Sequence, residues 1–181
     1  LGILAQTRGD YDTAHDRYLR ALTIKEELGD RAGMAITHHN LGILAQTRGD
    51  YDTAHDRYLR ALTIKEELGD RAGMAITHHN LGILAQTRGN YDTARTQYQQ
   101  ALTIFEELGN RVGMANTYGQ LGILAQDHDD YDTARTQYQR ALTIFEELGD
   151  RIGMANTYGQ LGILAQDQDN FSAGKNRSGR T

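Results

Sequence analysis

Cysteine and proline are absent from this chain of 181 residues, and aromatic side chains make up only 7% of it. Without cysteine there is no disulfide framework and no thiolate metal site, and the chain fits a reducing compartment, so we expect it to be cytoplasmic. Its turns must be built without proline. No apolar run approaches about eighteen residues, and no basic, apolar leader is visible. We therefore expect neither a membrane partner nor a signal peptide.

Charge of one sign is not in excess either, because 24 acidic and 19 basic residues are interspersed and leave a formal net charge of -5. No basic stripe is present to neutralise a phosphate backbone, so we expect no nucleic-acid partner. A glycine-rich phosphate loop, a GxSxG elbow and a paired nucleophile and base are missing as well. We expect no enzymatic activity and no cofactor in this chain, and any catalysis would belong to domains outside it.

What the chain has is repetition. Residues 1–40 and 41–80 are the same string, copies with substitutions begin at 81 and 121, and a truncated copy begins at 161. A fixed period of this size is typical of a solenoid, in which each unit buries its apolar face only against its neighbours. The chain starts partway through a helical pattern and has no initiator methionine, so we expect it to be an excerpt of a longer array.

Apolar residues follow helical spacing twice in each copy. The pattern predicts helices over 11–28, 31–47, 51–68, 71–87, 91–108, 111–127, 131–148 and 151–167. Between them, glycine followed by aspartate or asparagine, as in Gly69-Asp70, supplies a helix stop and a cap for the next helix. We predict an all-α, right-handed α-solenoid of antiparallel helix hairpins. Its expected domain is a single array over 1–170, with a partial first repeat at 1–28, hairpins at 31–68, 71–108 and 111–148, and the helix 151–167 as a cap. An irregular, flexible tail is expected over 171–181.

The repeat resembles a known family. Leu41-Gly42, Gly49-Asp50-Tyr51, Ala54, Tyr58 and Ala61-Leu62 are similar to the tetratricopeptide repeat pattern, and the same set returns 40 residues later. Gly42 and Ala54 are expected where two helices cross too closely for larger side chains, and Tyr58 is expected to fill the space between hairpins. The family's period of about 34 residues is lengthened here, and its usual proline is missing. Such lengthened repeats resemble those of Pins-type adaptors, kinesin light chains and bacterial signalling arrays.

The resemblance implies a protein-binding scaffold that holds an extended or helical peptide in a concave groove lined by the first helices. It also implies the sensor or adaptor part of a larger signalling protein. The groove positions carried over from the family are Ile36, His39, Asn40, Ile43, Thr47, Ile76, His79, Asn80, Ile83, Thr87, Asn116, Gln120, Ile123, Asp127, Asn156, Gln160, Ile163 and Asp167.

Two features of these positions suggest a ligand. Asn40, Asn80, Gln120 and Gln160 share one register, so they predict a ladder of side-chain amides able to pair with a peptide backbone. The earlier copies are apolar and carry histidine in the groove, whereas the later copies carry Asn, Gly and Asp. We hypothesise a bipartite peptide with a hydrophobic anchor and a basic end. The alternatives are amides that merely face solvent, and drift between older and younger repeats.

Two further motifs invite a metal interpretation, and for both we predict a structural role. His38-His39 and His78-His79 are adjacent on a helix, where side chains point about 100° apart, so we expect His38 and His78 to pack in the core. The acidic run Asp127, Asp129, Asp130 and Asp132 resembles the start of a calcium loop, but Tyr131 occupies a ligand position. We expect an acidic turn that caps the next helix, with Asp129 and Asp169 replacing the turn glycine, and no metal site.

A second hypothesis belongs to a different class. The array would then be a structural spacer or a self-associating element whose uncapped ends stack end to end. The two hypotheses differ in solution, because a monomeric adaptor keeps one mass at every concentration whereas a stacking element does not.

Overall fold

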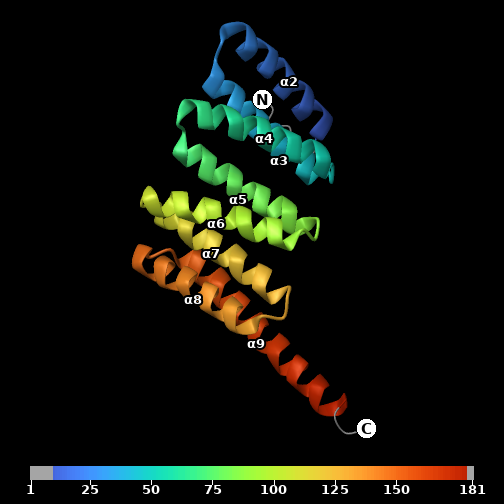
Figure 1. Ribbon diagram of the computed structural model, residues 1–181, viewed down its shortest axis with the longest axis vertical. Helices are drawn as coiled ribbons and strands as arrows, with labels where there is room; N and C mark the ends of the chain where they lie inside the picture. Colours follow the sequence, from blue (N-terminus) through green and yellow to red (C-terminus); the bar gives the residue numbers. More distant parts are fainter. Residues whose placement is uncertain (1–9, 179–181) are drawn as a thin grey trace. The chain divides into compact units, whose positions relative to one another are not determined.

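The structure is a computed structural model that describes the backbone of residues 10–178 and the side chains of residues 10–169. This part of the chain consists of helices joined by tight turns (Figure 1). The helices are α2 (Tyr11–Leu28), α3 (Arg31–Thr47), α4 (Tyr51–Leu68), α5 (Arg71–Thr87), α6 (Tyr91–Glu107), α7 (Arg111–Gln126), α8 (Tyr131–Leu148) and α9 (Arg151–Ser178). The all-α prediction is confirmed, and the first seven helices begin and end within one residue of the predicted bounds.

The exception is the end of α9, which was predicted near 167 with an irregular tail from 171, whereas the helix continues to Ser178. Asp129 does replace a turn glycine, with φ of 58°, but Asp169 lies inside α9, so that expectation is wrong. The reason is that α8 provides an apolar face that packs back onto α7, and the sequence after Asn170 provides none. Without a proline to stop it, the helix continues and keeps its backbone hydrogen-bonded. Residues 1–9 and 179–181, including the rest of the predicted tail, lie outside the described residues.

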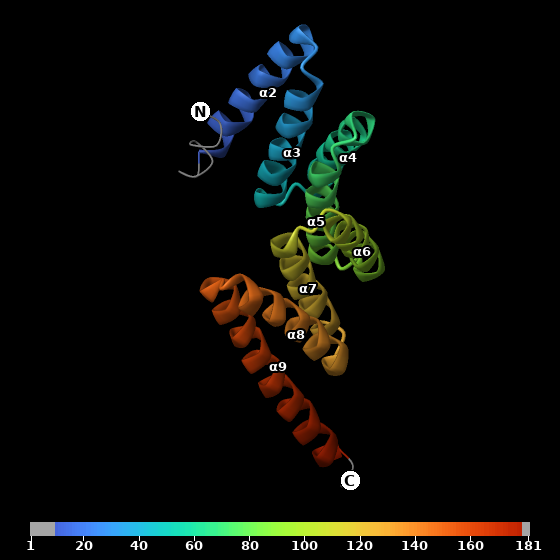
Figure 2. The same ribbon diagram turned by 90° about the vertical axis from the view of Figure 1, so that its left-hand side faces the viewer.

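The chain divides into two compact units, Leu1–Ile104 and Phe105–Thr181, with the boundary inside α6. In the first unit α2 packs on α3, α3 on α4 and α4 on α5, and in the second unit α7 packs on α8 and α8 on α9 (Figure 2). Each unit is therefore a stack of antiparallel hairpins, which confirms the α-solenoid class. A single array over 1–170 stays a prediction.

The turns between hairpins are built from glycine and a capping side chain, as the sequence predicted. After α4, Gly69 takes the left-handed conformation with φ of 67°, and its N–H donates to the Glu66 carbonyl at 3.1 Å. Asp70 Oδ1 then accepts the Gly73 N–H at 2.9 Å and caps α5. Glycine adopts this backbone conformation without a steric penalty, so no proline is needed to reverse the chain.

Within each hairpin a glycine of the first helix receives the ring of a tyrosine from the second. A Cβ added to Gly122 would lie 2.5 Å from the Tyr138 ring, closer than two such carbons can approach. The Tyr138 hydroxyl donates to Gln126 Oε1 at 2.9 Å, which satisfies the polar end of a ring that is only 1% exposed. The same arrangement recurs in the first unit at Gly42 with Tyr58 and at Gly82 with Tyr98. The expected roles of Gly42 and Tyr58 are thus confirmed.

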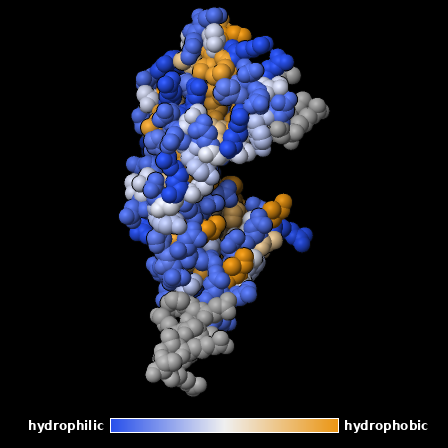
Figure 3. All heavy atoms as spheres, turned by 90° about the vertical axis from the view of Figure 1, so that its right-hand side faces the viewer, coloured by the Kyte–Doolittle hydropathy of each residue, from blue (hydrophilic) through white to orange (hydrophobic). Residues whose placement is uncertain are grey.

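The core of each unit is built around these tyrosines. Tyr58 packs with Leu81 and Leu84 in the first unit, and Tyr138 packs with Leu164 in the second. On the face drawn in Figure 3, hydrophilic side chains predominate and apolar ones form small groups. Among residues 10–178, no helix is both long enough and apolar enough to cross a membrane.

Two glycines at the same register provide a matched stability test. Gly122→Ala should lower the free energy of unfolding by about 1–3 kcal/mol, because its methyl group overlaps the Tyr138 ring. Gly162→Ala should raise it by about 0.5–1 kcal/mol, since alanine favours the helix and nothing lies within 4 Å of a Cβ at that position. Urea denaturation of both variants measures the difference. Equal effects of the two substitutions would contradict this account of the hairpin crossing.

Candidate binding grooves

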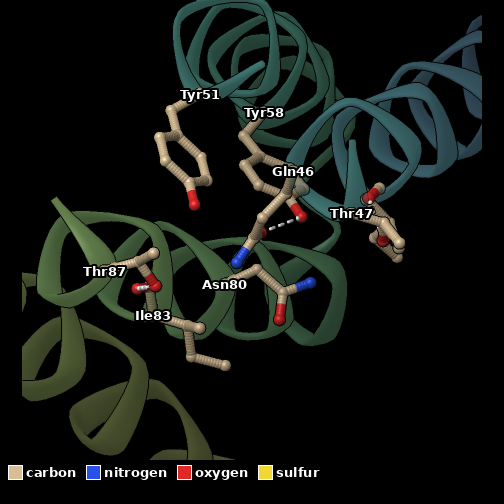
Figure 4. A pocket seen from close by; sticks show the side chains of 8 residues that line it. Gln46, Thr47, Tyr51, Tyr58, Asn80, Ile83 and Thr87 are labelled. Carbon is tan, nitrogen blue, oxygen red and sulfur yellow. Dashed lines mark hydrogen bonds between the residues drawn. The ribbon is translucent and has the colours of Figure 1, made fainter. Parts of the chain in front are cut away.

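A hollow of about 460 Å³ opens between α3 and α5 in the first unit (Figure 4). We term it the α3–α5 groove. It is lined by Ile43, Gln46, Thr47, Tyr51, Tyr58, Asn80, Ile83 and Thr87. Five of these residues, Ile43, Thr47, Asn80, Ile83 and Thr87, were predicted as groove positions from the family resemblance. The structure brings them together around one cavity.

Three polar residues of this lining, Gln46, Tyr51 and Tyr58, were not among the predicted positions. The prediction covered chosen positions of the first helices and omitted Gln46 of α3, whereas Tyr51 and Tyr58 belong to α4. The Tyr58 hydroxyl donates to Gln46 Oε1 at 2.9 Å, and Figure 4 shows the Gln46 amide nitrogen on the side of Asn80. A Gln and a Tyr twelve residues apart recur in these repeats. This recurring spacing is the sequence signal that could have identified Gln46 and Tyr58 as neighbours.

Asn80 is held in place by a histidine behind it. Its Nδ2 donates to His39 Nε2 at 3.1 Å, so His39 carries its proton on Nδ1 and points it at Thr77 Oγ1, 3.4 Å away. The imidazole also packs against the Tyr58 ring with centroids 5.4 Å apart. Burial, and then the charge of Lys65, lower the His39 pKa to about 4. A neutral imidazole therefore orients the Asn80 amide at ordinary pH.

Lys65 lies behind this cluster and is buried, with only 5% of its surface exposed. Its Nζ donates to Thr77 Oγ1 at 2.8 Å and to the Gly73 carbonyl at 3.2 Å. Burial lowers the Lys65 pKa, and the nearby Asp70 carboxylate opposes that shift. Lys25 makes the same pair of contacts, with Thr37 Oγ1 at 2.8 Å and the Gly33 carbonyl at 2.9 Å. The first unit therefore holds one lysine ammonium group beside the turn between α2 and α3 and another beside the turn between α4 and α5.

The second unit has a phenylalanine at the register of these lysines. A Cβ added to Gly153 would lie 2.4 Å from the Phe145 ring, and Gly113 meets Phe105 in the same way at 2.6 Å. Phe105 and Phe145 are 4% and 6% exposed. An aromatic ring thus replaces the hydrogen-bonded ammonium group. A buried positive charge packs against α5 in the first unit, whereas an uncharged ring packs against α9 in the second.

A second hollow, of about 190 Å³, lies between α7 and α9 in the second unit, and we term it the α7–α9 groove. It is lined by Ala115, Asn116, Gly119, Gln120, Ile123, Tyr138, Phe145, Gly153, Asn156, Thr157 and Gln160. The predicted residues among them are Asn116, Gln120, Ile123, Asn156 and Gln160. Both amides predicted for this unit, Gln120 and Gln160, therefore lie at one cavity.

Carboxylates lie beside the α7–α9 groove rather than in its lining. Gln126 Nε2 donates to Asp167 Oδ2 at 2.6 Å, while its Oε1 accepts from Tyr138. Burial raises the Tyr138 pKa to about 12, and the charges of Asp127 and Asp167 add to the shift. The first unit has Thr47 and Thr87 at the register of these two aspartates. The predicted Asp127 and Asp167 thus impose a negative potential on the tyrosine that lines this groove.

The other predicted groove residues lie outside these two linings. Ile36, Ile76 and Ile163 are exposed by 57%, 46% and 48%, and Asn40 and His79 are half-buried. His38 and His78 are 4% and 8% exposed, which confirms their predicted packing in the core. Asp130 Oδ1 accepts the Thr133 N–H at 3.1 Å, so the acidic run does cap α8. Among the described residues, no three His, Cys, Asp or Glu side chains are grouped to hold a metal ion.

A sequence model of the tetratricopeptide repeat matches residues 1–67, 58–107, 73–147 and 113–173. The chain belongs to the tetratricopeptide repeat family. Tetratricopeptide repeats form a family of non-catalytic scaffolds that bind proteins or peptides, so this chain is a protein-interaction scaffold. No curated protein sequence matches it significantly.

Solved structures share the tetratricopeptide fold. BtubC (BKLC) from P. vanneervenii is 26% identical with a TM-score of 0.76, and the match covers 97% of this chain and 78% of BtubC. The apo form of RapI is 19% identical with a TM-score of 0.83, covering 95% of this chain and 63% of RapI. A Pyrococcus horikoshii signal transduction ATPase with numerous domains, which has a tetratricopeptide repeat sensor, is 16% identical with a TM-score of 0.80. That match covers 88% of this chain and 25% of the ATPase. The chain thus spans less than two thirds of the last two proteins.

The buried histidines make the stability of this tetratricopeptide chain depend on pH. The pKa values of His38 and His39 fall from 6.5 to about 4 in the folded state, with burial as the largest cause. Between these pH values the unfolded chain binds protons that the folded chain excludes, so acid destabilises the fold. We expect the free energy of unfolding to fall between pH 6.5 and 4 by on the order of 2 kcal/mol per imidazole.

Urea denaturation at several pH values measures this loss, and an NMR titration of the His39 ring identifies its source. A His39 ring that became protonated near pH 6.5 in the folded chain would contradict the contacts with Asn80 and Thr77.

Proposed function

We propose that the α3–α5 groove and the α7–α9 groove each bind an extended peptide segment of a partner protein. The observation that carries this proposal is a shared constellation of three side chains. Ile43, Tyr58 and Asn80 line the first groove, and the residues two repeats further along, Ile123, Tyr138 and Gln160, line the second. Each groove therefore combines an aliphatic wall with a carboxamide from the next first helix.

The carboxamides are the groups that suit a peptide backbone. Each offers two donors and one acceptor, which match the carbonyl and N–H of an extended chain. At Asn80 one donor is used by His39, which fixes the amide plane before a ligand arrives and reduces the ordering cost of binding. Each hydrogen bond made in this way contributes about 0.5–1.5 kcal/mol net.

The side chains around the amides favour different ligand residues in the two grooves. In the α3–α5 groove, Ile43 and Ile83 provide an aliphatic surface beside the ring of Tyr51, which suits a leucine or an aromatic side chain. In the α7–α9 groove, the negative potential of Asp127 and Asp167 at Tyr138 suits a lysine or an arginine. These preferences correspond to the hydrophobic anchor and the basic end inferred from the sequence.

The wider role that we propose rests on analogy with a similar protein. The tetratricopeptide repeat of the P. horikoshii ATPase is described as a sensor. By analogy, this chain serves as the sensor or adaptor part of a larger, cytoplasmic signalling protein, in which peptide capture is the input.

A random peptide library selected on the chain tests the grooves, with Asn80→Ala and Gln160→Ala as separate variants. Each variant should lose about tenfold or more of the affinity for peptides that its own groove selects, since an unpaired backbone group is left behind. Gln139→Ala is the matched control, because it removes an exposed amide of α8 that lies outside both grooves. Failure of the folded chain to enrich any peptide, or equal losses in the control, would overturn the proposal.

Charge preference is tested with the paired variant Asp127→Asn and Asp167→Asn. Selection on this variant should lose its enrichment of lysine and arginine while it keeps the preference for apolar residues, because the amides retain shape but not charge. Binding of basic peptides to the original chain should weaken as salt is added. An unchanged enrichment of basic residues would show that these aspartates do not select the ligand.

A further inference from the structure

A second hollow of the first unit, with a volume of about 300 Å³, is bounded by α4, α5 and α6. We term it the α4–α6 hollow. All three helices are described from end to end, and the residues that line the hollow differ from those that line the α3–α5 groove. The lining consists of His55, Leu59, Leu81, Leu84, Ala85, Arg88, Asn90, Thr93 and Gln97.

The apolar part of this lining includes one leucine that water reaches. Buried residues of α5 lie at the base of the hollow, whereas Leu59 of α4 is 41% exposed. Helices α6 and α8 have Gln99 and Gln139 at the register of Leu59, so the repeat does not require an apolar residue there. A ligand with an aliphatic group that covers Leu59 removes this apolar surface from water.

The polar part of the lining is rich in hydrogen-bond donors. They are the guanidinium of Arg88, the imidazole of His55, the hydroxyl of Thr93 and the carboxamides of Asn90 and Gln97. Among the described residues, the lining of this hollow includes no carboxylate. A carboxylate of a ligand, which only accepts hydrogen bonds, therefore meets donors and no like charge in the lining.

Gln97 is oriented for such a ligand by a buried histidine. His78 is 8% exposed, and its Nδ1 donates to Gln97 Oε1 at 2.8 Å. Because this bond uses the amide oxygen, the two N–H groups of Gln97 Nε2 remain for the hollow that Gln97 lines. A donor that is held in place before binding reduces the ordering cost of binding.

Arg88 is also held in place and keeps donors to spare. Its Nη1 lies 2.9 Å from Asp52 Oδ1, and the side chain of Asp52 is 89% exposed. An ion pair this exposed to water is weak, and the guanidinium has further N–H donors besides the one at Nη1 that faces Asp52. Arg88 can therefore bind a second carboxylate.

A similar hollow recurs one repeat earlier and differs in charge. It has a volume of about 340 Å³, and most of its lining residues are those of the α4–α6 hollow 40 positions earlier. It differs by Asp50 in place of Asn90 and Arg57 in place of Gln97. A carboxylate at the register of Asn90 is therefore compatible with the fold, and at that position Asp50 Oδ1 caps α4 by accepting the Thr53 N–H at 3.2 Å.

We propose that the α4–α6 hollow binds a small aliphatic carboxylate. The carboxylate accepts hydrogen bonds from Arg88 and Gln97, and the aliphatic group covers Leu59. A volume of about 300 Å³ suits a ligand of this size. The C-terminal leucine of a polypeptide and a free branched-chain acid share this chemistry. Binding here does not depend on peptide capture in the grooves.

NMR titration of the full chain with N-acetyl-leucine and with N-acetyl-leucinamide tests the proposal. The acid should shift the methyl signals of Leu59 and Ala85 and bind roughly fivefold or more tightly than the amide, because only the acid accepts charge-assisted hydrogen bonds. Isocaproate distinguishes the two sources, since it lacks the amide group of a chain terminus: equal binding identifies a free acid, and weaker binding identifies a terminus. No shift with the acid, or equal affinity for acid and amide, would overturn the proposal.

Asn90→Asp tests the charge preference. Asp50 shows that an aspartate at this register still caps its helix, so the variant should fold. It should weaken binding of N-acetyl-leucine roughly fivefold or more, since the new carboxylate repels that of the ligand, and should leave the affinity for N-acetyl-leucinamide unchanged. An unchanged affinity for the acid would contradict a carboxylate site.

Leu59→Gln tests the aliphatic contact with the residue that α6 and α8 carry at this register. It should weaken binding of N-acetyl-leucine, whereas Leu68→Gln should not, because Leu68 is a 48% exposed leucine of the same helix outside the hollow. Asn80→Ala, which alters the α3–α5 groove, should also leave this affinity unchanged. Equal losses in the Leu59 and Leu68 variants, or a loss with Asn80→Ala, would contradict the assignment to the α4–α6 hollow.

Discussion

The contact of a tyrosine ring with a glycine in the same hairpin is the constraint on which each unit depends. At Gly42, Gly82 and Gly122 the missing side chain lets the second helix approach until its tyrosine lies on the first. The buried hydroxyl must then find a partner, and Gln46, Gln86 or Gln126 supplies it at 2.9 Å. One small residue thus sets the spacing of each hairpin, and at Gly42 the same contact brings Tyr58 and Gln46 to the wall of the α3–α5 groove.

The two units have diverged behind this constant contact. In the first unit Lys65 satisfies Thr77 and the backbone of α5 from inside the turn, and its charge helps to keep His39 neutral. In the second unit Phe145 fills the same space with a ring against Gly153, and Asp167 takes the place of a threonine beside the groove. The packing tolerates both solutions because no polar group loses its partner: where phenylalanine replaces lysine, the Thr157 hydroxyl still donates to the Gly153 carbonyl at 2.8 Å. The two grooves therefore differ in charge, because Asp127 and Asp167 stand where the first unit has Thr47 and Thr87, while the helix hairpins are the same.

Single exchanges within a constant hairpin also distinguish two hollows of the first unit. The α4–α6 hollow and its counterpart one repeat earlier have similar linings, but Gln97 stands where the earlier hollow has Arg57. A buried histidine meets each of these side chains, His78 at 2.8 Å from Gln97 and His38 at 3.4 Å from Arg57. In a repeat protein the same hairpin is used several times, so each copy can change the chemistry of its surface without changing its packing.

The sequence by itself determined the helices, their turns and the family, because helical periodicity, Gly-Asp stops and the Gly-Tyr pattern are local and recur in register. The family resemblance gave Asn80, Gln120 and Gln160 as groove positions, and these three residues line cavities, whereas Asn40 of the same register lines neither groove. Only the tertiary structure decided the rest. Tyr51 and Tyr58 reach the α3–α5 groove from another helix. Burial and the charge of Lys65 lower the pKa of His39. The spacing of residues along one helix encodes neither of these effects. The continuation of α9 to Ser178 was decided in the same way, because a turn forms where a following helix can pack, and packing is a property of the fold.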